Sequence, residues 1–141
     1  MSLELFVSLA GLLISTFAIL FTIFSFKKQL QLQFFADYTK RYQEIILNFP
    51  ENINESTFDL NSLDKCERDK TLRYMRAYFD LCAEEYFLWR KNNIDKETWS
   101  EWETGIKFAL SKTSFKQAWE ILRLDSIYYG EFVKFVTDQN K

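Results

Sequence analysis

Hydrophobic and polar positions follow two different patterns along this chain. The first pattern is Leu5–Phe26, a run of 22 consecutive residues without a charged side chain. At about 1.5 Å per residue, a helix of this length spans about 33 Å, enough to cross a hydrocarbon layer of about 30 Å. A cleaved signal peptide is the alternative, but Glu4 makes the preceding residues acidic and the run is too long for that class of segment. The pattern predicts a transmembrane helix.

Charges on either side of this run predict its orientation. Glu4 precedes the run, whereas Lys27 and Lys28 follow it directly. By the positive-inside rule, the N-terminus lies outside and the C-terminal part lies in the cytoplasm. No later segment is apolar enough to form a second span. We therefore predict a single-pass protein with a transmembrane anchor or pore helix over residues 1–26 and a cytoplasmic α-helical domain over 27–141.

The second pattern covers residues 27–141, where apolar residues recur every three or four positions, as in amphipathic helices. The expected helices cover residues 27–49, 62–91, 96–110, 114–124 and 126–137, with Ser62, Asp95 and Ser126 as N-cap residues. The expected buried face of the longest one consists of Leu72, Met75, Phe79, Cys82, Tyr86 and Trp89. Residues 50–61 are polar and predict a linker. The fold class is all-α, with the membrane helix continuing into a helical bundle that has an aromatic core.

Composition narrows the chemistry available to this chain. It contains no histidine, which excludes Ser-His-Asp catalysis and histidine-ligated zinc. Its two cysteines, Cys66 and Cys82, are expected on one helix about 24 Å apart, too far for a disulfide, and are interpreted as small core residues. Carboxylates are interpreted as solvated helix faces; they include Glu84, Glu85, Glu97, Glu101 and Glu103. We expect no enzyme, no cofactor and no metal site.

Small and polar residues of the apolar run form a stripe. Its members are Glu4, Ser8, Gly11, Ser15, Ala18, Thr22 and Ser25, separated alternately by four and three residues. This 3.5-residue period places them on one face of a left-handed supercoil and predicts self-association of the spans. The stripe fits either a tight dimer seam or the lining of a pore in a higher homo-oligomer, with a tetramer favoured. The alternative is a chance register of residues that are common in membrane helices.

Three basic residues of the helix expected over 62–91 fall on one side. Lys65, Arg73 and Arg76 lie within about 80° of one another around the helix axis. Repeated around an oligomer, such a cluster could bind phosphate groups, while Tyr74 and Tyr78 on the other side of the apolar face could stack bases. The alternative is simple surface pairing with Glu67, Asp69 and Asp80.

The run RAYFDLCAEEYFLWRKNNIDKETWSEWETGI (Arg76–Ile106) resembles small bacterial membrane-anchored proteins of unknown function. They share one N-terminal span, a helix with an aromatic and acidic middle, an Asn/Asp turn and a Trp-rich helix. The architecture is also similar to Hailong-type channel effectors of bacterial antiphage defence, in which a nucleotidyltransferase partner makes a nucleic-acid oligomer that controls a membrane channel. The resemblance implies a bacterial inner-membrane location and a ligand supplied by a partner enzyme.

Together these patterns favour a homo-oligomeric membrane ion channel or membrane-depolarising effector. Its partners would be further copies of itself, the lipid bilayer, and a nucleotide or short oligonucleotide that acts through the helical domain. The alternative is a membrane-anchored adaptor that recruits another protein through its aromatic-rich bundle.

Overall fold

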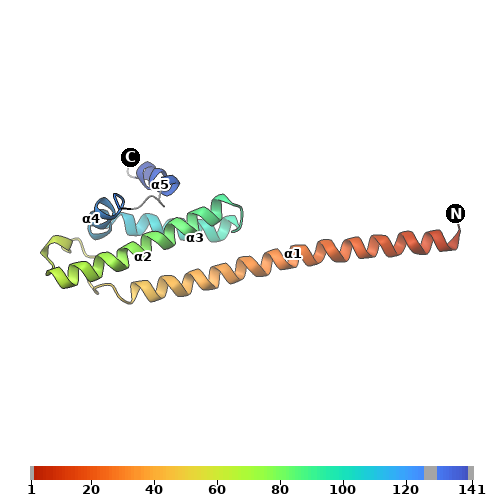
Figure 1. Cartoon of the computed structure of the whole chain (residues 1–141), viewed down its shortest axis with the longest axis horizontal. Helices are drawn as coiled ribbons and strands as arrows, with labels where there is room; N and C mark the ends of the chain where they lie inside the picture. The colour runs from red at the N-terminus through yellow and green to blue at the C-terminus, as the bar shows by residue number, and fades with distance from the viewer. Residues whose placement is uncertain (1, 126–129, 140–141) are drawn as a thin grey trace. The chain divides into compact units, whose positions relative to one another are not determined.

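The computed structural model describes residues 2–125 and 130–139, and it is all-helical over these residues, with no strand. The elements are α1 (Leu3–Ile46), the short 3-10 helix η1 (Leu60–Ser62), α2 (Lys65–Arg90), α3 (Lys96–Leu110), α4 (Thr113–Leu122) and α5 (Gly130–Gln139) (Figure 1). The all-α prediction is confirmed. The chain divides into two compact units, one up to Phe34 and one from Phe35 onward, and α1 contributes to both.

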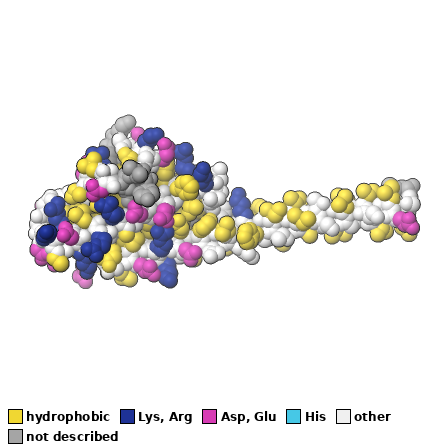
Figure 2. Space-filling model, viewed as in Figure 1, with side chains coloured by type: hydrophobic (Ala, Val, Ile, Leu, Met, Phe, Trp, Pro, Cys, Tyr) yellow, Lys and Arg dark blue, Asp and Glu magenta, His cyan; other side chains and the backbone are white. Residues whose placement is uncertain are grey.

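In the first unit, α1 exposes its apolar side chains. Figure 2 shows hydrophobic side chains along its length. Its most apolar 18-residue window has a mean hydropathy of 2.3, and none of that window is buried. Among the described residues, α1 is the one helix long and apolar enough to cross a membrane. This agrees with the candidate span predicted over Leu5–Phe26.

The N-cap residue was predicted correctly for α3 and wrongly for α2. Asp95 caps α3 as predicted, because its carboxylate accepts a hydrogen bond from the backbone N–H of Thr98 at 2.9 Å. The prediction that Ser62 caps α2 is wrong. Asp64 occupies that position and accepts from the backbone N–H of Glu67, also at 2.9 Å. The Ser62 hydroxyl instead donates to the Asp59 carbonyl within the turn of η1.

Helix α2 ends at Arg90, one residue before the predicted end, and the pair Asn92 and Asn93 follows shortly after. Asn92 adopts a left-handed backbone with φ of 56°, a conformation that asparagine tolerates better than most residues. The N–H of Asn93 then donates to the Leu88 carbonyl, and the N–H of Asn92 donates to the Trp89 carbonyl. These two bonds satisfy carbonyls that the helix end would leave without partners, so the chain can turn sharply into α3.

The core of the second unit is aromatic, and α2 supplies its centre. Met75, Phe79 and Cys82 are buried as predicted, with Leu72, Tyr86 and Trp89 half-buried against the core. Edge-to-face contacts join Phe79 to Trp119 of α4, with ring centroids 5.1 Å apart. Cys66, in contrast, is exposed, so its interpretation as a core residue is wrong.

The segment expected to be a linker over residues 50–61 is anchored to the core. Ile53, Phe58 and Leu60 are buried in it. The fully buried Ser114 hydroxyl of α4 donates to the Ile53 carbonyl at 2.7 Å, and the Leu60 N–H donates to the Gln117 side chain at 3.0 Å. Helix α4 begins at Thr113, so Ser114 lies in its first turn. From there its side chain holds the segment 50–61 against the core.

At the C-terminal end, α4 stops at Leu122, two residues earlier than predicted. The predicted cap Ser126 lies outside the described residues. Helix α5 includes Gly130–Gln139, and its Phe132 and Val136, four positions apart on one helix face, are buried.

Candidate functional site

The predicted stripe lies on α1, within the first unit. Its seven members are exposed, except for the half-buried Ser25. The Ser15 hydroxyl donates to the Gly11 carbonyl at 2.9 Å, and the Thr22 hydroxyl donates to the Ala18 carbonyl at 2.8 Å. These hydroxyl donors are thus satisfied inside the helix, while their oxygen lone pairs remain open to other groups.

The predicted phosphate-binding residues lie on α2. Lys65 and Arg73 are exposed, whereas Arg76 is half-buried. Arg76 Nη2 forms an ion pair with Asp125 Oδ2 at 3.1 Å. Asp125 is not one of the acidic partners that the sequence suggested. One of the three cations is therefore already engaged, and the proposed role of the cluster stays a prediction.

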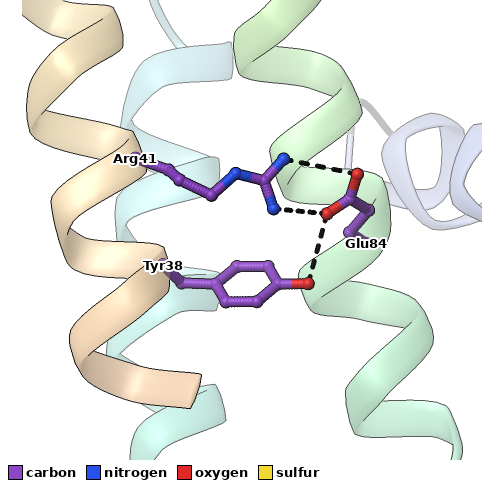
Figure 3. A network of polar contacts seen from close by, with 3 residues as sticks. All are labelled: Tyr38, Arg41 and Glu84. Carbon is purple, nitrogen blue, oxygen red and sulfur yellow. Dashed lines mark hydrogen bonds and ion pairs between the residues drawn. The ribbon is translucent and has the colours of Figure 1, made fainter. Parts of the chain in front are cut away.

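A polar network joins α1 to α2 within the second unit (Figure 3). Arg41 donates two hydrogen bonds to Glu84, from Nη1 to Oε2 at 2.6 Å and from Nη2 to Oε1 at 3.4 Å. The Tyr38 hydroxyl donates to the same Oε2 at 3.2 Å. Burial, and then the Glu84 charge, raises the pKa of Tyr38 to about 12, so its hydroxyl keeps its proton at physiological pH. Glu84 thus accepts three hydrogen bonds from two residues of α1.

Beside this network lies a cavity of about 300 Å³, bounded by α1, α2 and α3. Its aromatic walls come from all three helices: Phe35, Tyr38, Tyr42, Tyr78 and Trp102. Two carboxyl groups also line it, those of Glu85 and Glu101. Its volume is at the lower end of the range in which proteins bind small organic molecules.

Glu85 is the unusual group of this cavity. Its side chain is only 6% exposed, and no described residue forms a hydrogen bond or an ion pair with its carboxyl group. Burial raises the pKa of Glu85 to about 8; the Arg41 charge opposes this shift, whereas the Glu84 charge adds to it. The group therefore carries a proton over much of the neutral range.

Sequence reasoning missed this site in two ways. Glu85 was interpreted as part of a solvated face, and Tyr78 was expected at the border of the apolar face, but both are buried. The signal was available, because Glu85 lies three residues after Cys82 and seven after Tyr78, on the same helix face.

No family model, curated protein or solved structure matches this chain.

Proposed function

We propose that this chain is a single-span membrane protein that assembles into a homo-oligomeric ion channel or membrane-depolarising effector, acting in bacterial antiphage defence. The observation that carries the proposal is the surface of α1. Its apolar side chains are exposed, and one stripe of small and polar residues interrupts them at a 3.5-residue period. Such a helix gains from a bilayer around it and from close contact with copies of itself along the stripe.

In this proposal the helical domain lies in the cytoplasm and controls the span. The lysine pair after the apolar run favours that orientation. Lys65 and Arg73 offer two exposed cations for the phosphates of a nucleotide or oligonucleotide, and Arg76 could join them by leaving its exposed partner Asp125. An ion pair of this kind contributes only about 0–1 kcal/mol, so a phosphate could replace the carboxylate.

The test is to express the full chain in bacteria and to record membrane potential with a voltage-sensitive dye. We expect depolarisation when the ligand-producing partner or a matching ligand is present. Ser15→Leu should reduce it, because a larger apolar side chain enters the stripe, whereas Leu13→Ile, on the side of the helix opposite the stripe, should not. Full depolarisation by Ser15→Leu, or none by the unaltered chain under any condition, would contradict the channel.

A second candidate is a membrane-anchored adaptor, with which the hydroxyl geometry is compatible. Since Ser15 and Thr22 donate to carbonyls of their own helix, their donors need no partner helix in a bilayer. Subunit number in mild detergent separates the two functions. A monomer or dimer favours the adaptor, whereas a tetramer or larger ring favours the channel.

A further inference from the structure

We propose that the cavity bounded by α1, α2 and α3 binds a small organic ammonium ion, that is, a protonated or quaternary amine attached to an apolar body. This site differs from the phosphate-binding cluster of the proposed function in both place and charge. The inference does not depend on whether the chain forms a channel.

The walls of the cavity have the chemistry that attracts such cations. The Tyr38 and Trp102 rings stack with their centroids 5.4 Å apart, and Phe35 stacks on the same tryptophan at 6.3 Å. The Tyr42 ring of α1 and the Tyr78 ring of α2 also pack together, with their centroids 6.3 Å apart. The faces of aromatic rings carry negative charge density that attracts cations. Since Arg41 already lies over the Tyr38 ring, the other rings that line the cavity, those of Phe35, Tyr42, Tyr78 and Trp102, would supply this attraction for an ammonium group.

The two carboxyl groups supply the charge that an ammonium ion needs. Glu85 is buried and has no hydrogen-bond or ion-pair partner among the described residues, whereas Glu101 is exposed and lines the same cavity. The Glu85 oxygens are not among the fully buried atoms that lack a partner, and the residue lines the cavity. The ionised carboxylate would be poorly solvated there, and a bound cation would offset that cost. None of the described residues that line the cavity is a lysine or an arginine.

Arg41, the cation whose charge acts on Glu85, is already engaged. Arg41 is held by both oxygens of Glu84, and its guanidinium also lies over the Tyr38 ring, 5.2 Å from the ring centroid. Its charge therefore acts on Glu85 from outside the cavity and is partly cancelled by Glu84. The same carboxylates and rings disfavour a phosphate, so an anionic nucleotide would not occupy this space.

Binding of the ammonium ion should release a proton from the protein. The pKa of Glu85 is about 8 without a ligand, so at pH 7 an ammonium ion must displace the proton to meet a carboxylate. The groups around Glu85 are Tyr38, Arg41 and Tyr42 on α1, Tyr78, Cys82 and Glu84 on α2, and Glu101 on α3. The tyrosines and the cysteine keep their protons at this pH, since burial raises the pKa of Tyr38, Tyr42, Tyr78 and Cys82. The proton released on binding should therefore come from Glu85.

The experiment is calorimetric titration of the full chain in detergent micelles at pH 7. The probe is phenethylammonium chloride, and its neutral analogue is 2-phenylethanol, which has a similar apolar body. We expect saturable binding of the ammonium ion, at least tenfold tighter than that of the alcohol. Glu85→Gln should weaken ammonium binding at least tenfold and leave the alcohol unchanged. Glu120→Gln, on the exposed face of α4, is the matched control and should change neither.

A second measurement keeps the inference testable if Glu85→Gln does not fold. Titration of the unaltered chain in two buffers of different ionisation enthalpy gives the number of protons released per ligand, which should approach one at pH 7. Equal affinity for the ammonium ion and the alcohol, no proton release, or full binding by a folded Glu85→Gln variant would overturn the site. These outcomes are independent of membrane potential and so leave the channel proposal to its own test.

Discussion

Arg41 and Glu84 connect α1 to α2 by two side-chain hydrogen bonds, at 2.6 and 3.4 Å. The two side chains are 44% and 49% exposed, so water screens the ion pair. The contact nevertheless fixes the rotation of α1 about its own axis at this point, because the Tyr38 hydroxyl donates to the same carboxylate. The pair therefore orients the residues of α1 that face the cavity.

The first prediction concerns the energy of this pair. Glu84→Gln and Arg41→Met should each lower the free energy of unfolding by only about 0.5–1 kcal/mol, the range for exposed ion pairs. The double variant should cost less than the sum of the two single variants, because either change already removes the interaction. Urea unfolding of all four proteins measures the coupling. Strict additivity would show that the pair makes no energetic contribution.

The second prediction concerns pH. In the unfolded chain the Glu85 carboxyl loses its proton near pH 4.5, whereas the folded domain raises its pKa to about 8. Between these values the folded state binds more protons, so stability is greatest below about pH 4.5 and falls as pH rises toward 8. The decrease contributed by this group is at most about 1.4 kcal/mol per pH unit.

Glu85→Gln should remove this contribution. Its stability should be close to that of the unaltered chain at pH 5 and clearly higher at pH 8, with other titrating groups common to both proteins. The measurement is chemical unfolding at pH 5, 6, 7 and 8. A constant difference between the two proteins across this range would show that Glu85 titrates normally.

The third prediction concerns the segment between α1 and α2. Ser114→Ala leaves the buried Ile53 carbonyl without its donor and should cost about 1–3 kcal/mol. Ser100→Ala, on an exposed position of α3, should change stability by less than about 0.5 kcal/mol. Thermal unfolding monitored by circular dichroism compares them. Equal melting temperatures would mean that the segment is not anchored through Ser114.

The features that could be predicted from the sequence are local. Asp95 and Asn92 determine boundaries through bonds to residues a few positions away, and the period of Met75, Phe79 and Cys82 marks a buried face. Ser62 and Asp64 are both good caps, and the choice between them depends on η1, a turn that the polar pattern of residues 50–61 concealed.

The cavity could not be predicted, for a physical reason. Its walls come from three helices, with lining residues spread along the chain from Phe35 to Ile106, and no local pattern determines how these helices meet. The burial of Glu85 could nevertheless have been predicted, because the residue lies on the apolar face of α2 despite its charge. A carboxylate on an apolar face indicates either a buried partner or a site.

The fourth prediction concerns the stripe on α1. Single cysteines at Ser8, Ser15 and Thr22 should cross-link between subunits much more efficiently than cysteines at Leu13 and Leu20, since only the first set shares the 3.5-residue period. The exposed Cys66 is first replaced by Ser and the buried Cys82 by Ala, so that neither reacts. Non-reducing electrophoresis of membranes measures the products. Similar yields at all five positions would exclude the stripe as a contact surface.

The last prediction concerns the cations of α2. If Lys65, Arg73 and Arg76 bind a polyanion, binding of short oligonucleotides should weaken as salt rises, because counterions compete for the same phosphates. Lys65→Glu with Arg73→Glu should abolish binding without loss of helical signal, since both side chains are exposed. Arg76→Glu also breaks the ion pair with Asp125, an added cost of no more than about 1 kcal/mol. Lys96→Glu, a single charge reversal at the exposed start of α3, is the control and should bind normally. The measurement is fluorescence anisotropy of labelled oligonucleotides at two salt concentrations. Binding that survives the double reversal, or that ignores salt, would remove this cluster as the ligand site and favour the adaptor.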